Sequence, residues 1–492
     1  MFSMLILTKP EKLIFSYTFS LFLFVFFPLM IVGYYQYDDI GRSVDGYLRW
    51  SSDGRFVPDL LFKTLMMGEA VHDISPLPQI IAIFFISINA LIIKKISPTL
   101  SVFSCVLTNS VIFATPLFLE NMSYVYDSMT MVISITTATA AAYMVLRGNR
   151  FKLTTSAALL FIALSTYQVS INVYLIFVLA GSIATANSYK IYLKNVVYSL
   201  SPVLISLVLY KLSIPLYPIG SYQASHSGTV SASEILTVVP SNIYGGLSYL
   251  ARMINFNVYY TIIIFVLFII SCLSFISNLH RKFGILLIGF LSIVVLITMV
   301  VGIQSILSNP VWKPRTAIGF GAVYAALLAF SLTDKSRVQL NRILVTISVL
   351  YLGAFITFAY SQAAYLRNVK LYQQVYLSKI ADEINKARYE TGLISLSIVG
   401  WQTYPSSIQN SLVSAPYLRM VNGSPVYGEG WWSLRSLHLY GMDADINLSG
   451  KDWRDVCSTT RQLRYRHYGE KTGYTIESNG EALVLIFSGA CD

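Results

Sequence analysis

Residues 14–35 read IFSYTFSLFLFVFFPLMIVGYY, a run of 22 residues without a charged side chain. A helix needs about 20 mainly apolar residues to cross a bilayer core, so this run is long enough to span a membrane. Lys9 and Lys12 precede it. The run is too long and too aromatic for a removable signal peptide, and no small-residue cleavage site follows it. We therefore expect a retained membrane helix.

The whole chain has the composition of a membrane protein. Of its 492 residues, 55% are hydrophobic and 12% are charged, and the mean hydropathy is +0.61. Soluble domains carry about 25% charged residues, so a soluble enzyme, a disordered chain and a disulfide-rich module are excluded. Residues 1–365 hold 34 charged side chains, whereas the 127 residues of 366–492 hold 25. We predict an α-helical polytopic membrane domain over 1–365 and a water-facing domain over 366–492.

Hydropathy predicts eleven transmembrane helices, and basic residues predict their orientation. With the N-terminus in the cytoplasm, the inner loops hold fourteen Lys and Arg and the outer loops hold seven, as the positive-inside rule requires. Because eleven is odd, the C-terminal domain then lies outside the cytoplasm. Nearly all of the net charge of +11 comes from residues 1–365, so it needs no nucleic acid partner. The predicted spans are 14–35, 76–93, 98–118, 128–146, 153–168, 171–188, 196–215, 257–277, 284–304, 317–333 and 343–365.

Three outer loops stand out by length or polarity, at 36–75, 216–256 and 305–316. In the first loop, Asp45 and Arg49 are four residues apart, a spacing that allows an ion pair on one helix face. The apolar positions from Phe56 to Met66 predict a second short helix, of a kind that can lie in the membrane interface.

The C-terminal domain is predicted to be a small α/β domain. Residues 367–390 have apolar positions at helical spacing, and 393–399 form a strand. The segments YTIE and ALVLIF predict a hairpin near the end of the chain. Cys457 and Cys491 would lie in an oxidising compartment, where either a disulfide or two free thiols are compatible with the sequence.

Asp38 and Asp39 follow the first predicted span directly and are candidate catalytic residues. A carboxylate near a low-dielectric boundary can have a raised pKa and act as a general base. Adjacent side chains point in different directions, so one carboxylate would face a substrate while the other makes supporting contacts. The sequence does not decide which of the two is the base. The alternative interpretation is that both acids lie at the start of an ordinary solvated outer loop.

Further polar residues are expected at the same outer surface. Glu120 and Asp127 bracket a short connection between two spans, and Gln168 lies at another tight outer turn. These side chains are candidate functional residues. The alternative is an ordinary turn, in which Asp127 caps the following helix.

A set of cations could hold a phosphate at this surface: Arg42, Arg55, Lys211, Lys313 and Arg315. Arginine and lysine side chains are the usual protein ligands of phosphate. The alternative role is attraction to anionic lipid headgroups. Lys211 lies near the end of its span, where a functional role and snorkelling to the interface are both possible.

The sequence contains neither a phosphate-binding glycine loop nor a His and Cys spacing typical of zinc, so we predict no cofactor and no metal site. Four tryptophans in or near outer segments could form an aromatic platform for a ligand or an interfacial aromatic belt. They are Trp50, Trp312, Trp431 and Trp432.

Three further segments carry a family resemblance: FLENMSYVYDSM at 118–129, LSTYQVSINVYLIF at 164–177 and WKPRTAIGFG at 312–321. Together with the paired acid they resemble the Gtr-type O-antigen glucosyltransferases, within the GT-C superfamily of polyprenyl-phosphate-sugar-dependent enzymes. The resemblance covers Asp38 to about residue 321. It does not extend to the C-terminal domain, so the choice of acceptor cannot be inherited from the family.

The resemblance implies an inner-membrane enzyme that moves glucose from undecaprenyl phosphate to an O-antigen sugar hydroxyl in the periplasm, with inversion. Many relatives of this broad class use a divalent metal, but a phosphate monoester as leaving group needs less charge neutralisation than a diphosphate, so we expect no obligatory metal. The outer tryptophans could form a sugar platform. Asp38 or Asp39 would take the hydroxyl proton. Lys313 and Arg315, helped by Arg42 or Lys211, would hold the departing phosphate, and Glu120, Asp127 and Gln168 would bind sugar hydroxyls or orient the base. The competing hypothesis is a transporter or flippase of a lipid-linked sugar, which would place ionisable residues near mid-membrane.

Overall fold

The computed structural model describes residues 7–148, 151–186, 188–283, 286–334, 336–418, 430–450, 469–471, 473–478 and 480–487. The chain forms two compact units. The first, called the helical unit, comprises Met1–Ile31, Arg49–Met67 and Ile74–Ser361. The second, called the mixed unit, comprises Val32–Leu48, Gly68–Asp73 and Gln362–Asp492.

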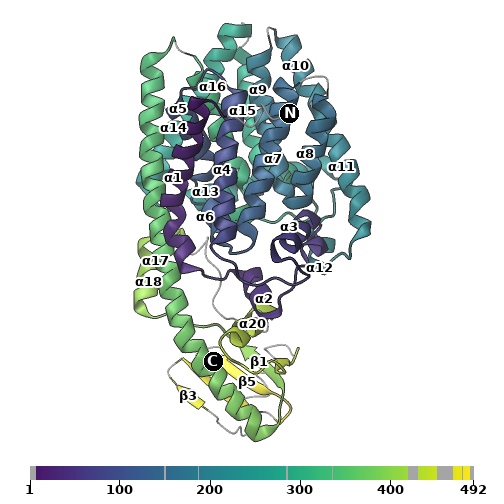
Figure 1. The fold of residues 1–492 in the computed structure, drawn as a ribbon, viewed down its shortest axis with the longest axis vertical. Coiled ribbons are helices and arrows are strands. Elements are labelled where there is room, and N and C mark those ends of the chain that lie inside the picture. The colour runs from purple at the N-terminus through teal and green to yellow at the C-terminus, as the bar shows by residue number, and fades with distance from the viewer. Residues whose placement is uncertain are drawn as a thin grey trace. The chain divides into compact units, whose positions relative to one another are not determined.

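The helical unit is built from apolar helices joined by short turns (Figure 1). In chain order its α-helices are α1 (Lys9–Val32), α3 (Phe56–Met66), α4 (Leu77–Ile96), α5 (Val102–Phe113), α6 (Phe118–Ser123), α7 (Asp127–Arg147), α8 (Lys152–Thr166), α9 (Ile171–Thr185), α10 (Tyr189–Tyr198), α11 (Leu200–Ser213), α12 (Ser221–His226), α13 (Ile235–Ile254), α14 (Val258–Phe283), α15 (Leu286–Val301), α16 (Ile318–Leu332) and the first part of α17 (Val338–Thr391). Short 3-10 helices include η2 (Trp50–Asp53), η3 (Gln168–Ser170), η4 (Ile214–Leu216), η5 (Gly302–Ile306) and η6 (Pro314–Thr316).

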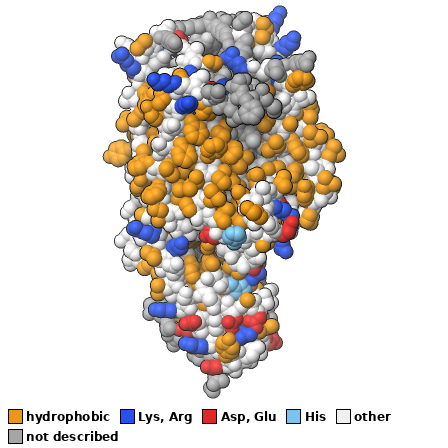
Figure 2. Space-filling model, in the orientation of Figure 1, with side chains coloured by type: hydrophobic (Ala, Val, Ile, Leu, Met, Phe, Trp, Pro, Cys, Tyr) orange, Lys and Arg blue, Asp and Glu red, His pale blue; other side chains and the backbone are white. Residues whose placement is uncertain are grey.

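Seven helices of the described chain are long and apolar enough to cross a membrane. Four shorter apolar helices lie at the other predicted spans, over Val102–Phe113, Lys152–Thr166, Gln168–Ser182 and Ile318–Leu332. Figure 2 shows hydrophobic side chains over most of the visible flank of the helical unit. An exposed apolar surface of this extent is typical of a protein surrounded by lipid.

Small and polar residues let the helices pack closely. A Cβ atom on Gly321 of α16 would lie 2.3 Å from the carbonyl oxygen of Ile112 on α5, and one on Gly319 would lie 2.7 Å from that of Val300 on α15. Glycine therefore allows α16 to contact both neighbours backbone to backbone, as in other membrane helix pairs. This close packing fixes the start of α16, directly after η6.

The mixed unit combines helices with a five-stranded sheet. Its helices are α2 (Tyr37–Asp45), the end of α17, α18 (Ser406–Ser414) and α20 (Trp431–Leu439). The sheet has the order β2-β1-β5-β4-β3, with β1 (Ser395–Val399) parallel to both β2 (Asn447–Leu448) and β5 (Leu483–Phe487). Strand β4 (Tyr474–Ser478) pairs antiparallel with β5 and with β3 (Gly469–Lys471). Leu377, Ile384, Ile398, Leu437 and Leu485 are fully buried between the sheet and the helices.

The predicted short helix at 56–66, the strand near 393–399 and the final hairpin are all confirmed. The predicted span at 343–365 and the predicted helix at 367–390 are parts of one continuous helix of 54 residues, α17. The one residue between these two ranges, Leu366, favours helix, so nothing in the sequence ends the helix there. Cys457 and Cys491 lie outside the described residues.

Candidate functional site

Asp127, at the start of α7, is buried and paired with a cation from the loop that precedes α3. Its Oδ1 lies 3.3 Å from Nη1 of Arg55 and accepts a hydrogen bond of 2.6 Å from Nε1 of Trp50. The Asp127 side chain is 1% exposed and that of Arg55 is 11% exposed. Arg55 also contacts Asp53, with Nη2 3.2 Å from Oδ2. The positive charge of Arg55 is therefore shared between two carboxylates.

Glu120, on α6, is paired in the same way with Arg315 of η6. Its carboxylate accepts hydrogen bonds from the backbone nitrogen of Arg315 at 2.8 Å and from Nη1 at 2.7 Å. The same Nη1 donates to the hydroxyl of Tyr124 at 2.7 Å. This Glu120–Arg315 pair joins residues 195 positions apart in the chain. It therefore holds η6 against the turn between α5 and α7.

The turn between α8 and α9 connects to both ion pairs. The Tyr167 hydroxyl donates to the carbonyl oxygen of Arg315 at 3.1 Å. The amide of Gln168 donates to the carbonyl oxygen of Asp53 at 3.0 Å and to the hydroxyl of Tyr210 at 2.8 Å. Glu120, Asp127, Arg55, Arg315 and Gln168 consequently form one polar cluster, which we call the paired cluster.

Two predicted cations differ from those of the paired cluster. Lys313 and Lys211 have exposed side chains, and within the described part of the chain neither forms an ion pair. Lys313 precedes Pro314, two residues from Arg315, whereas Lys211 lies in the last turn of α11. Lys313 is therefore an exposed, unneutralised cation adjacent in sequence to the paired cluster.

The two neighbouring acids of α2, in the mixed unit, are not equivalent. Asp39 is fully buried and its Oδ2 accepts a hydrogen bond of 3.1 Å from the backbone nitrogen of Gln36. This bond satisfies a backbone N–H at the start of the helix. Asp38 is only partly buried, and among the described residues its carboxylate makes no hydrogen bond or ion pair. Asp38 is thus the carboxylate that is available to a ligand.

The face of α2 that carries Gly41 and Asp45 packs on α20. Trp431 lies against Gly41, where a Cβ would approach its ring to 1.9 Å, and Asp45 forms an ion pair of 2.8 Å with Arg435. Arg42 is 2% exposed, with its guanidinium 5.7 Å from the ring centre of Tyr47.

Two expectations about this region are wrong. Asp45 does not pair with Arg49 on one helix face, because α2 ends at Asp45 and Arg49 has a left-handed backbone conformation (φ 53°). Trp50 is neither a sugar platform nor an interfacial residue, since it is fully buried and stacked on Phe62 at a ring distance of 4.7 Å.

Sequence reasoning missed two neutral members of the paired cluster, Trp50 as a hydrogen-bond donor to Asp127 and Tyr210 as the partner of Gln168. Tyr124 lies inside the polar connection from Glu120 to Asp127 and Tyr167 directly precedes Gln168, so both belong to segments that the sequence singles out. Tyr210 lies in an apolar helix, and nothing in the local sequence distinguishes it. Over the described ranges, no three His, Cys, Asp or Glu side chains gather closely enough to hold a metal ion.

Residues 12–326 match the family described as Glucosyl transferase GtrII. The chain belongs to the GtrII glucosyl transferase family. The match includes Asp38, Asp39 and every residue of the paired cluster, and it ends before α17. Membership of this family supports a glycosyltransferase activity. The long apolar helices of the chain agree with a membrane protein.

A relative in Salmonella phage P22 extends the similarity beyond the GtrII region. That protein, described as an uncharacterized 55.3 kDa protein in the gtrB 5' region, is 25% identical over 481 residues. The similarity covers 94% of this chain and 96% of the phage protein. No solved structure matches this GtrII family member.

Proposed function

We propose that this protein transfers glucose from undecaprenyl phosphate to a sugar hydroxyl of lipopolysaccharide O-antigen, on the periplasmic face of the bacterial inner membrane. Membership of the GtrII family supports glucosyl transfer. The observation that carries the proposal is the partly exposed and unpaired carboxylate of Asp38, which lies within the residues matched to the family. Such a group is available to accept a proton from an incoming hydroxyl.

The proposal includes an orientation in the membrane. Seven long helices and four shorter apolar helices occur where eleven spans are expected. With a cytoplasmic N-terminus, Asp38, the paired cluster and Lys313 all belong to periplasmic segments, as does the C-terminal α/β domain over 366–492. A lipid-linked donor and a periplasmic polysaccharide could then meet at one membrane surface.

Asp38 is assigned as the general base and Asp39 as its positioning residue. The acceptor oxygen attacks the anomeric carbon as the bond from that carbon to the phosphate oxygen breaks, which inverts the configuration. The hydroxyl proton passes to Asp38, and undecaprenyl phosphate leaves with the bonding electron pair. Asp39 holds the first turn of α2 through the backbone of Gln36.

Lys313 is assigned as the principal ligand of the departing phosphate. It is exposed and unpaired, whereas Arg315 is engaged by Glu120 and Arg55 by Asp53 and Asp127. An unneutralised ammonium stabilises growing negative charge more than a cation already held by a carboxylate. The paired cluster, including Gln168, orients η6. Lys211, which is exposed, acts as a secondary cation, whereas Arg42 is buried within the mixed unit.

Reconstitution with both substrates tests the proposal. The purified chain in proteoliposomes receives undecaprenyl phosphate carrying radiolabelled glucose, together with unmodified O-antigen from the bacterium that carries the gene. The expected result is label in the polysaccharide, with inverted configuration at the new linkage. Label that crosses the vesicle membrane without appearing in polysaccharide would instead support a flippase and contradict the proposal.

A further inference from the structure

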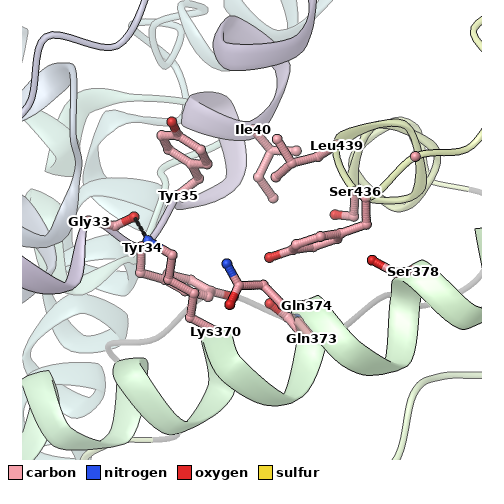
Figure 3. Close-up of a pocket in the computed structure, with 12 residues that line it drawn as sticks. Gly33, Tyr34, Tyr35, Ile40, Lys370, Gln373, Gln374, Ser378, Ser436 and Leu439 are labelled. Carbon is pink, nitrogen blue, oxygen red and sulfur yellow. Dashed lines mark hydrogen bonds between the residues drawn. The ribbon is translucent and has the colours of Figure 1, made fainter.

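The mixed unit contains a cavity of about 640 Å³ that is separate from the residues assigned to catalysis. Its walls come from the segment that precedes α2, from one face of α17 and from the end of α20 (Figure 3). The volume falls within the range of about 300–1,000 Å³ typical of small-molecule sites. A ligand larger than one sugar ring can therefore be accommodated.

One wall is a polar stripe on α17. Lys370, Gln374 and Ser378 are four residues apart, so they lie on one side of the helix, and all three line the cavity. Figure 3 shows Ser436 and Leu439 of α20 across the cavity from Ser378. The cavity therefore has hydrogen-bonding groups on one side and both a polar and an apolar side chain on the other.

Some of the lining side chains form hydrogen bonds within the protein, and others are available to bind a ligand. Lys370 donates to the carbonyl oxygens of Val32 at 2.8 Å and Gly33 at 3.0 Å, and the Tyr35 hydroxyl donates to Asp73 at 2.6 Å. By contrast, the Gln374 amide and the Ser378 and Tyr440 hydroxyls have no hydrogen bond to any described residue.

The available groups are uncharged and accompanied by aromatic rings. Of the twelve described residues that line the cavity, Lys370 is the one charged side chain, and two of its three protons are already engaged. A phosphate or carboxylate would therefore lack the paired basic donors that usually bind it. Tyr34, Tyr35 and Tyr440 offer ring surfaces for the apolar faces of sugars. Burial raises the pKa of Tyr440 to about 12, so its hydroxyl remains a donor at neutral pH.

We propose that this cavity binds an uncharged oligosaccharide segment of the acceptor polysaccharide, away from the sugar that receives glucose. The identification of the ligand as the acceptor rests on the proposed function. The cavity lies outside the residues matched to the GtrII family, which end at 326, apart from those that precede or begin α2. The mixed unit would thus supply acceptor specificity, whereas the transfer reaction itself would be common to the family.

Binding without donor tests the cavity independently of transfer. The full chain in detergent is titrated by calorimetry with unmodified O-antigen polysaccharide released from the lipopolysaccharide of the bacterium that carries the gene. Gln374→Trp fills the cavity and should raise the Kd at least about 10-fold, and Tyr440→Phe removes one hydrogen bond and should raise it about 2- to 10-fold. Val375→Trp is the matched control, because Val375 is the next residue of α17, 60% exposed and not part of the wall.

The outcomes separate the two proposals. The cavity proposal would be overturned if wild type, Gln374→Trp and Tyr440→Phe bound the polysaccharide with equal affinity and thermal unfolding showed that all three proteins are folded. Tighter binding of inorganic phosphate than of polysaccharide would also overturn it. Binding that Gln374→Trp weakens, in a protein that transfers no glucose, would contradict only the proposed function. Glucose transfer with the same polysaccharide KM for Gln374→Trp and Val375→Trp would contradict only the cavity.

Discussion

The acids of α2 and those of the paired cluster lie in segments with the same sequence signature, yet they make different contacts. Glu120 and Asp127 are buried, and each is matched by an arginine from a distant segment. Asp38 is partly exposed and unpaired within the described residues, and its neighbour Asp39 is buried at the start of α2. A short polar connection after a membrane helix can therefore either fix the scaffold or present a reactive group.

The difference has a direct energetic reason. Burying a carboxylate without a partner costs free energy. Glu120 and Asp127 are therefore each stabilised by an arginine, which largely neutralises their charges. A carboxylate that keeps contact with water needs no partner and remains free for a ligand. We therefore expect substitutions in the paired cluster to affect folding first, and substitutions at Asp38 to affect chemistry first.

The largest expected effect is on catalysis at Asp38. Asp38→Asn should lower kcat about 10²- to 10⁴-fold, because the variant loses a general base. The free energy of unfolding should stay unchanged, since the carboxylate makes no bond to the described chain. Asp45→Asn on the same helix is the control and should retain nearly full activity. Radiolabelled glucose transfer measures both, and wild-type kcat in Asp38→Asn would remove Asp38 from the mechanism.

Breaking the Glu120–Arg315 pair should have the next largest effect, on stability. Glu120→Gln should lower the free energy of unfolding by about 2–3 kcal/mol, since it removes charged hydrogen bonds and leaves the Arg315 guanidinium with only partial access to water. Chemical unfolding in a mild detergent measures this change. Asp445→Asn, in a more exposed ion pair with Arg388, should cost much less, because solvent screens this pair. Equal losses in the two variants would mean that burial does not distinguish the pairs.

Lys313 extends the comparison from acids to cations. Lys313→Gln should lower kcat/KM for the lipid-linked donor about 10-fold, the value of one charge-assisted contact of about 1.4 kcal/mol. Its unfolding should match wild type, because the side chain is exposed and unpaired. Arg315→Gln, in contrast, should destabilise the protein. Unchanged donor kinetics in Lys313→Gln would exclude Lys313 from the phosphate site.

The smallest effect is expected at Asp39. Asp39→Ala should lower the free energy of unfolding by about 1 kcal/mol, because the backbone N–H of Gln36 loses its carboxylate partner at the start of α2. Any loss of kcat should be smaller than that of Asp38→Asn. A larger loss of kcat in Asp39→Ala, with stability intact, would exchange the roles of the two acids.

Much of the fold could be predicted from local sequence. Membrane helices depend on runs of apolar residues, and the final hairpin depends on two short strands with a turn between them, so both leave a local pattern. Helix ends were less predictable. The continuous α17 has no glycine or proline between Ser361 and Arg367, so hydropathy alone placed a boundary where the backbone has none.

The candidate site was predictable in its members but not in its contacts. Glu120, Asp127 and Gln168 were identified by their position in short polar connections between predicted membrane helices. Trp50 and Tyr210 were missed because an aromatic residue in an apolar or interfacial segment has no distinctive signal. Their hydrogen bonds depend on which distant backbone or carboxylate they meet.

Local sequence shows that this protein is helical and apolar, and which few acids and bases lie between its helices. Which of those charges are neutralised follows from the fold. Arg315 lies 195 residues from Glu120, and Arg55 lies 72 residues from Asp127. No local pattern encodes such a pairing, because it arises when close helix packing brings distant segments together and burial favours opposite charges in contact. Asp38 makes no such pair with any described residue, and the chemistry is therefore assigned to it.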